Sequence, residues 1–165
     1  MERYPQKYTK PLKVLGFDFG TKRIGVAYGQ SLTGTAQAIG IIPATDGIPD
    51  WTKLEALVAN WQPDVFVVGL PFNMDDSDSE LLLRARKFGK RLNGRLHKPC
   101  FGVDERLTSF EARGELLRGE ANGAVDALAA RLILEAWFDG LPPLPASADP
   151  DAAGEPVAAG RPDNS

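Results

Sequence analysis

The sequence predicts a mixed α/β fold in which a five-stranded sheet is flanked by helices. Short apolar and β-branched runs alternate along the chain with segments whose apolar residues recur every three or four positions. The strongest apolar run, Val65 to Leu70, is continuous, as expected of a strand that is buried on both faces. The resulting order, β-β-β-α-β-α-β-α-α, is typical of a mixed sheet covered by helices.

The first half of this pattern is a meander of strands followed by a helix. The runs at 14–18, 24–28 and 36–42 are separated by glycine-bearing turns, so we expect three sequential strands. Residues 50–61 are predicted to be helical, and Pro63 ends this helix. The apolar residues with helical spacing are Trp51, Leu54, Leu57, Val58 and Trp61.

The second half contains two capping boxes, which are typical of helix starts. Ser77 and Glu80 form the first and predict a helix that runs to about residue 92. Thr108 and Glu111 form the second. The remaining predicted elements are a strand at 100–104, a short helix at 111–117 and a last helix at 124–138.

Composition divides the chain into an extension at 1–11, one domain at 12–140 and a tail at 141–165. The tail holds 6 of the 13 prolines and no aromatic residue, so we expect it to be disordered. It carries four acids against one arginine and therefore holds the whole net charge of −3, so residues 1–140 together are neutral. A domain of this length can build its own core.

Composition also excludes several classes of protein. A single cysteine, Cys100, forbids an intramolecular disulfide, and a single histidine, His97, excludes a histidine-based zinc site. No apolar run approaches the ~20 residues of a membrane span. The polar start, residues 1–11, lacks the apolar segment of a secretory signal. We therefore expect a cytoplasmic protein without a membrane partner.

Two acids stand where predicted strands end. Asp18 closes the first strand, and Glu105 directly follows the last one. In α/β sheets, ligands bind beyond the carboxyl ends of the strands, and a buried acid without a partner is costly. Simpler explanations exist for both acids: Asp18 could cap the turn that follows it, and Arg106 could pair with Asp104 or Glu105 in a solvated loop.

Asp126 is the most informative acid because it lies on an apolar helix face with Ala130, Ile133 and Trp137. Burying an unpaired carboxylate costs several kcal/mol, and the helix dipole returns only about 0.3–1 kcal/mol. A metal ion or a positive partner is therefore required, unless the first turn is exposed. Three such acids supply the oxygen ligands that Mg²⁺ or Mn²⁺ prefers, and a two-metal site of this kind hydrolyses phosphodiesters.

Basic side chains lie near these acids and along one predicted helix. From Arg84 to Lys98 there are seven Lys and Arg residues and no acid. One stripe on this helix comprises Arg84, Lys87 and Arg91. Beside it lies an apolar arc that we expect to pack inward, made of Leu81, Ala85, Phe88 and Leu92. A row of basic residues by itself is usually a solvated helix face. Beside a metal site, the better interpretation is that the row binds the phosphate backbone of a nucleic acid.

Four segments resemble, in order and at similar spacing, the motifs of the YqgF/RuvX family, which has an RNase H-like fold. They are Phe17-Asp-Phe-Gly-Thr-Lys-Arg-Ile-Gly-Val-Ala27, Val67-Val-Gly-Leu-Pro-Phe-Asn73, Asp104-Glu-Arg-Leu-Thr-Ser109 and Asp126-Ala-Leu-Ala-Ala-Arg-Leu-Ile-Leu-Glu135. The resemblance covers about residues 13–138. It implies that the first three strands are antiparallel and that two further strands run parallel to the first.

The family's members resemble Holliday-junction resolvases and are described as nucleases that mature the 5′ end of pre-16S rRNA. The resemblance implies that Asp18, Glu105 and Asp126 are metal-binding catalytic acids, with Asp18 bridging two Mg²⁺ or Mn²⁺ ions. A metal-activated water would attack the phosphodiester in line. The residues expected to neutralise the scissile phosphate are Lys22, Arg23 and Arg106, and those expected to position backbone or water are Thr21, Asn73, Thr108 and Ser109.

Three alternatives remain open. Asp18-x-Gly-Thr also resembles the phosphate loop of actin and sugar-kinase ATPases, but those proteins need two such domains. A non-catalytic nucleic-acid-binding or ribosome-assembly factor is disfavoured because clustered acids oppose phosphate. A four-way-junction resolvase needs two symmetric active sites, whereas we expect a monomer or a weak homodimer. Bound divalent ions would make the neutral part of the chain, residues 1–140, positive, so nucleic-acid binding should depend on metal and weaken with salt.

Overall fold

The fold is described from a computed structural model, which covers residues 1–72, 79–107 and 122–144. Three predictions lie outside these ranges: the cap at Ser77, the short helix at 111–117 and the disorder of the tail beyond residue 144. Within the described ranges, none of the helices has both the length and the apolar character needed to cross a membrane.

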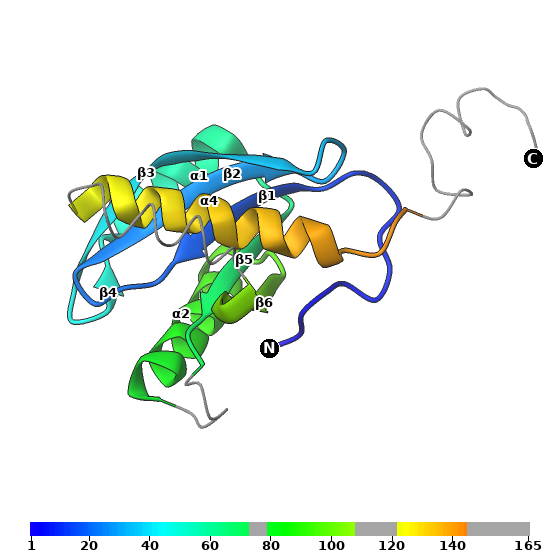
Figure 1. The fold of residues 1–165 in the computed structure, drawn as a ribbon. Helices are drawn as coiled ribbons and strands as arrows, with labels where there is room; N and C mark the ends of the chain where they lie inside the picture. The colour runs from blue at the N-terminus through cyan, green and yellow to red at the C-terminus, as the bar shows by residue number, and fades with distance from the viewer. Residues whose placement is uncertain (73–78, 108–121, 145–165) are drawn as a thin grey trace, which may run out of the picture.

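The strands form one six-stranded mixed sheet in the order β4-β3-β2-β1-β5-β6 (Figure 1). Their bounds are Lys13–Asp18 (β1), Arg23–Gln30 (β2), Thr35–Thr45 (β3), Ile48–Pro49 (β4), Val65–Leu70 (β5) and Cys100–Asp104 (β6). Strands β1, β2 and β3 are antiparallel, β5 is parallel to β1, and β6 is parallel to β5. The predicted fold class and strand directions are confirmed, and the predicted count of five strands is wrong by one.

The additional strand, β4, belongs to a hairpin that strand patterning missed. Asp46 and Gly47 form its turn with positive φ angles of 51° and 82°. Asp-Gly is a preferred sequence for a two-residue turn of this kind. Thr45 then pairs with Ile48. The turn signal was present in the sequence, but a strand of two residues is too short to show an alternating pattern.

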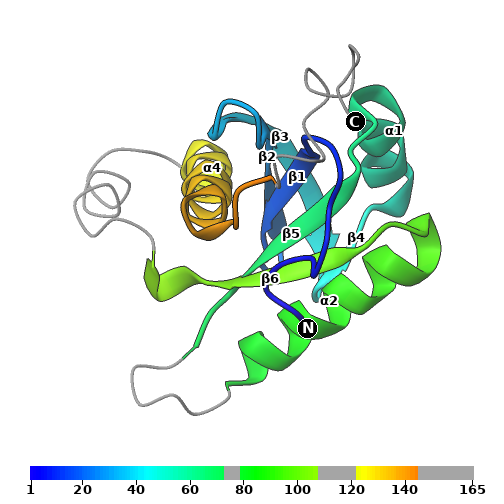
Figure 2. The same ribbon diagram turned by 90° about the vertical axis from the view of Figure 1, so that its right-hand side faces the viewer.

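Helices cover both faces of the sheet (Figure 2). The helices α1 (Trp51–Trp61) and α2 (Glu80–Leu96) lie on one face, and α4 (Asn122–Gly140) lies on the other. A single 3₁₀ turn, η1 (Glu105–Leu107), follows β6. The two faces have separate apolar cores, so polar residues on opposite faces of the sheet have different neighbours.

The start and the buried face of α2 differ from the prediction. Ser79 is the N-cap, and its hydroxyl accepts a 3.0 Å hydrogen bond from the Leu82 amide. Within this first turn Leu82 reaches the core, whereas Leu81 is 38% exposed, so the expectation that Leu81 packs inward was wrong. The rest of the predicted arc, Ala85, Phe88 and Leu92, is buried as expected.

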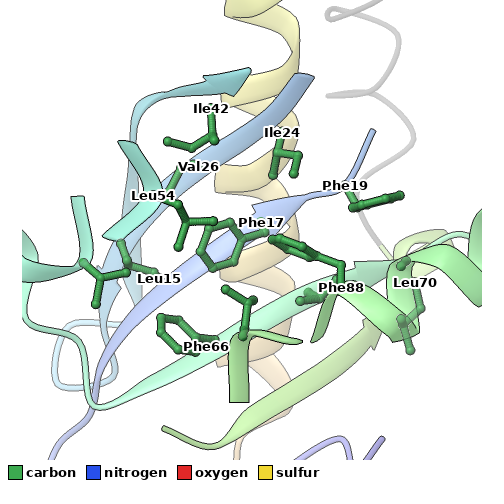
Figure 3. Packing of buried hydrophobic residues seen from close by; sticks show 14 of the residues in the cluster. Leu15, Phe17, Phe19, Ile24, Val26, Ile42, Leu54, Phe66, Leu70 and Phe88 are labelled. Atoms are coloured by element: carbon green, nitrogen blue, oxygen red, sulfur yellow. The ribbon is translucent and has the colours of Figure 1, made fainter. Parts of the chain in front are cut away.

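Side chains alternate between the two cores along β1. Leu15 and Phe17 point into the core beneath α1 and α2, where the Phe17 and Phe88 rings meet nearly at right angles, 5.4 Å apart (Figure 3). Val14 belongs to the other core, beneath α4. Because successive strand residues face opposite sides, Asp18 falls on the α4 side.

The N-terminal extension, residues 1–11, lies along β6 and the C-terminal part of α4. The Gly102 amide of β6 donates a 2.9 Å hydrogen bond to the carbonyl of Glu2. The Trp137 indole donates a 2.6 Å bond to the carbonyl of Arg3, and the Tyr4 ring packs on the same indole at 5.4 Å. The extension therefore packs onto the domain that follows it.

Candidate active site

Asp18 occupies the carboxyl end of β1 and is half-buried. In the antiparallel register its strand partner is Gly25 of β2. The turn between these strands is tight, since a Cβ at Gly20 would lie 2.5 Å from the Arg23 carbonyl. This turn brings Arg23, at the start of β2, back toward the end of β1.

Asp126 is brought next to this strand pair by a close approach of α4. A Cβ at Gly25 would overlap the carbonyl oxygen of Asp126 and would lie 2.9 Å from the Ala127 amide nitrogen. Only glycine allows the helix backbone so near the strand. Because Gly25 is the partner of Asp18, the part of α4 at Asp126 lies beside the end of β1.

Glu105 reaches the same edge of the sheet from the other side of β1. It follows β6, and its side chain lies over Gly69 of β5, the strand next to β1. Phe17 is in register with Val68 of β5, so Gly69 comes next to Asp18 along the parallel pair. A Cβ at Gly69 would lie 2.9 Å from Oε1 of Glu105 and 2.5 Å from Cδ1 of Ile133. Asp18 is thus flanked by two glycines, one beneath α4 at Asp126 and one beneath the side chain of Glu105.

Asp126 is paired with Arg23 across a wide sequence separation. The Arg23 Nε atom lies 2.9 Å from Oδ2 of Asp126, and the two side chains are 44% and 25% exposed. Residues Ala130, Ile133 and Trp137, predicted to share its face, are buried. The sequence required a metal ion or a positive partner for Asp126, and Arg23 is that partner in this structure.

The described residues do not form a complete metal site, although their chemistry suits one. Across residues 1–72, 79–107 and 122–144, the structure holds no group of three His, Cys, Asp or Glu side chains arranged to bind an ion. The donor chemistry nevertheless fits, because Asp18, Glu105 and Asp126 offer the carboxylate oxygens that Mg²⁺ and Mn²⁺ prefer. Gly25 and Gly69 allow the Asp126 backbone and the Glu105 side chain to approach the strands on either side of Asp18. An ion at Oδ2 of Asp126 would compete with the Arg23 guanidinium.

Arg106 is clamped by Asp104 at the end of β6. Its Nε lies 3.0 Å from both carboxylate oxygens, one terminal nitrogen lies 2.6 Å from Oδ2, and its amide donates to Oδ1 at 2.9 Å. These bonds hold the pKa of the Asp104 carboxyl below its usual range. The pairing of Arg106 with Asp104 was one of the simpler explanations for this segment, and the structure contains it.

The other predicted basic residues lie in different surroundings and do not form one basic surface around the acids. Lys22 is exposed and forms no ion pair within the described part of the chain. Arg84 contacts the β3–β4 turn, 2.9 Å from Asp46, and also Glu80 at 3.2 Å; hydrogen bonding to Asp46 raises its pKa. Arg91 is half-buried on α2, and Lys87 lines a groove described below.

Of the remaining predicted site residues, only Thr21 lies in the described ranges. Thr21 is half-buried, and its carbonyl accepts a 2.9 Å hydrogen bond from the Gly47 amide, which ties the β1–β2 turn to the β3–β4 turn. Three residues, Asn73, Thr108 and Ser109, lie outside the described ranges. Sequence reasoning missed Phe72, whose ring lies 5.3 Å from the Arg106 guanidinium and 5.6 Å from that of Arg86. Its position just after β5 was the available signal.

The sequence model of the RuvX family, described as Holliday junction resolvase, matches residues 12–140. This chain belongs to the RuvX family. The family resemblance drawn from four motifs is thereby confirmed, and the mixed sheet with its three antiparallel strands is the one that the resemblance implied.

Relatives of this RuvX-family chain carry a more specific name. A Marinobacter nauticus protein named "Putative pre-16S rRNA nuclease" is 57% identical over 130 residues, covering 76% of this chain and 91% of the relative. A Pseudomonas aeruginosa protein of the same name is 55% identical over 135 residues, covering 78% and 94%. Thermus thermophilus RuvC in complex with a Holliday junction substrate is 13% identical with a TM-score of 0.49, covering 77% and 94%, a likeness too weak to bear on the site.

Proposed function

We propose that this RuvX-family protein is a metal-dependent nuclease that hydrolyses a phosphodiester of precursor 16S rRNA. The observation that supports the proposal is the placement of Asp18, Glu105 and Asp126 at the same edge of the sheet, with glycines in the two strands flanking Asp18. The name shared by the relatives supports the substrate. This role belongs to ribosome biogenesis in the cytoplasm, with precursor rRNA or a ribosome precursor as partner.

In the proposed mechanism, Asp18, Glu105 and Asp126 would hold the metal, with Asp18 between the other two acids. Bound Mg²⁺ or Mn²⁺ ions would supply an activated water and stabilise the leaving oxygen. Arg23 has two successive tasks in this scheme. It neutralises Asp126 in this structure, and it would hold a phosphate oxygen of the substrate if an ion took its place at that carboxylate. Arg106, oriented by Asp104, supplies a second fixed positive charge at the same edge.

Other side chains contribute to substrate binding in this proposal. Lys22 is exposed beside the site and can approach a phosphate without first breaking an ion pair with any residue that the structure describes. Residues Asn73, Thr108 and Ser109, with Thr21, position backbone or water. The basic residues of α2 contact more distant phosphates, and these are Arg84, Lys87 and Arg91.

A second candidate substrate is a four-way DNA junction, which the family's description favours. Cleaving both strands of a junction symmetrically requires two active sites related by two-fold symmetry. We propose a monomer or a weak homodimer. Light scattering across a concentration series, with and without a four-way junction, distinguishes the two substrates: a stable dimer on the junction would favour the resolvase.

The first test is cleavage by Asp18→Asn with Mg²⁺ or Mn²⁺, using precursor rRNA, a single strand and a four-way junction side by side. We expect a loss of about 100-fold or more, because the substitution removes a central anionic ligand at nearly constant volume. Asp50→Asn is the matched control, since Asp50 caps α1 away from the site and asparagine caps equally well. Full activity of Asp18→Asn with an unchanged melting temperature would contradict the assignment.

A further inference from the structure

A groove of about 1220 Å³ separates the N-terminal extension from α2, beside β6. The extension supplies Met1 and Lys7 to its lining, and α2 supplies Leu83, Lys87 and Lys90. Cys100, the first residue of β6, lines it as well. The acids of the candidate active site are not among its lining residues, so this is a separate surface of the protein.

The groove is strongly basic. Four positive side chains line it, Lys7, Arg86, Lys87 and Lys90, against the single acid Glu2. The three lysines are exposed, and within the described residues none of them forms an ion pair. Unpaired lysines on both walls are suited to a chain of phosphates, because binding then costs no existing ion pair and releases counterions.

The groove also offers apolar contact surface. Leu83 is 54% exposed and Met1 is 46% exposed, so two large apolar side chains are accessible within this charged groove. The bases of an unpaired strand can cover such side chains, whereas the bases of a duplex are stacked inside it. Burial raises the pKa of the Cys100 thiol to about 12, so this residue stays protonated and adds no nucleophile. The groove is therefore a binding surface without chemistry of its own.

Arg86 connects the groove to the candidate active site. It lines the groove, and its guanidinium lies 5.6 Å from the centre of the Phe72 ring. The Arg106 guanidinium lies 5.3 Å from the centre of the same ring, at the end of β6 where Glu105 follows. Positive charge and an aromatic ring thus continue from the groove to the sheet edge that carries the acids.

We propose that this groove binds a single-stranded segment of nucleic acid that flanks the bond to be cleaved. The proposal rests on the proposed nuclease function for its substrate class and extends it with a second contact surface. It also gives the N-terminal extension a role, because Lys7 and Met1 form one wall.

The test measures binding without cleavage, using full-length protein with Asp18→Asn, EDTA and a fluorescent single-stranded RNA of 12 nucleotides. Lys87→Gln/Lys90→Gln should weaken binding roughly 10- to 30-fold at 0.1 M salt and reduce the slope of log affinity against log salt by about 1.4. Lys13→Gln/Lys53→Gln is the control, with the same change of charge at exposed residues outside the groove. Lys7→Gln should reduce the slope by about 0.7.

Equal affinity and equal salt slope for the groove variant and the control would overturn the proposal. Unchanged binding by Lys7→Gln would overturn the part assigned to the extension. If polyglutamate of equal charge competes as well as RNA, the groove takes acidic polypeptides and the assignment to nucleic acid is wrong. Since no arm needs metal or turnover, failure of the nuclease proposal shows as absent cleavage by the wild type and leaves these binding results interpretable.

Discussion

The acid site beneath α4 and the basic groove beside α2 balance their charges in different ways. At the acid site, Asp126 is held by Arg23 and Arg106 is held by Asp104. In the groove, Lys7, Lys87 and Lys90 have no ion-pair partner among the described residues. A phosphate can therefore enter the groove directly, whereas it can approach the acids only after cations have neutralised them. Contact with nucleic acid should be salt-dependent at the groove and metal-dependent at the acids.

The two regions also differ in how they are built. The acid site depends on backbone packing at Gly25 and on the contact of Glu105 with Gly69. The groove is lined by long exposed side chains of α2 and the extension. Substitutions at the acid site should therefore disturb the fold or the metal, and substitutions in the groove should change affinity alone.

The largest effect on the acid site is expected from Gly25→Ala. The new methyl group would overlap the Asp126 carbonyl, so α4 must move away from β2, and we expect a loss of about 3 kcal/mol in the free energy of unfolding by urea. Gly40→Ala in β3 is the matched control, because no described atom lies within 4 Å of its Cβ position. Equal stability of the two variants would show that α4 does not depend on this close approach.

Arg23→Gln separates the two proposed tasks of that residue. Removing the guanidinium frees Oδ2 of Asp126, so the affinity for Mn²⁺ measured by calorimetry should rise up to about fivefold, the equivalent of an exposed ion pair of about 1 kcal/mol. Cleavage at saturating metal should fall, since a phosphate contact is lost. Lys22→Gln removes the neighbouring charge without an ion pair and should change Mn²⁺ affinity less. Weaker Mn²⁺ binding by Arg23→Gln would contradict competition at Asp126.

The smallest effect on stability is expected from Asp104→Asn, and it should depend on pH. Because Arg106 lowers the pKa of Asp104, the pair stabilises the fold above the ordinary aspartate pKa of about 3.9 and loses this contribution as pH falls through the folded pKa. The difference in urea midpoint from the wild type should be constant from pH 7 to 5 and shrink below about pH 4. Asp46→Asn, which loosens an exposed pair, should show little difference at any pH.

Most of the fold was predictable from local sequence because the strand and helix signals are strong. Continuous apolar residues marked β5, and helical spacing marked α1 and α4. The start of α2 was predicted at Ser77, whereas the N-cap is Ser79, because both serines suit an N-cap and local sequence does not choose between them. The short β4 was missed although Asp46-Gly47 signals its turn.

For the candidate site, the sequence singled out Asp18, Glu105 and Asp126 as a prediction, but it did not show that Arg23 pairs with Asp126. The apolar face that carries Asp126 required a cation, yet nothing local distinguishes a metal ion from an arginine. Arg23 lies 103 positions away and is brought near only by the packing of α4 on β2. Whether Asp18, Glu105 and Asp126 bind metal stays a prediction. The groove could not be predicted because the extension's contacts with β6 and α4 are long-range.

The hydrogen bond from Gly102 to Glu2 has a practical consequence for handling the protein. β6 is the last strand of the sheet, with β5 as its only strand neighbour among the described elements. An uncovered strand edge is a template on which another chain can add a strand. Residues 1–4 partly cover that edge, so a fusion or truncation at the N-terminus would expose it and promote self-association unrelated to the native oligomeric state. Purification tags therefore belong at the other end of the chain.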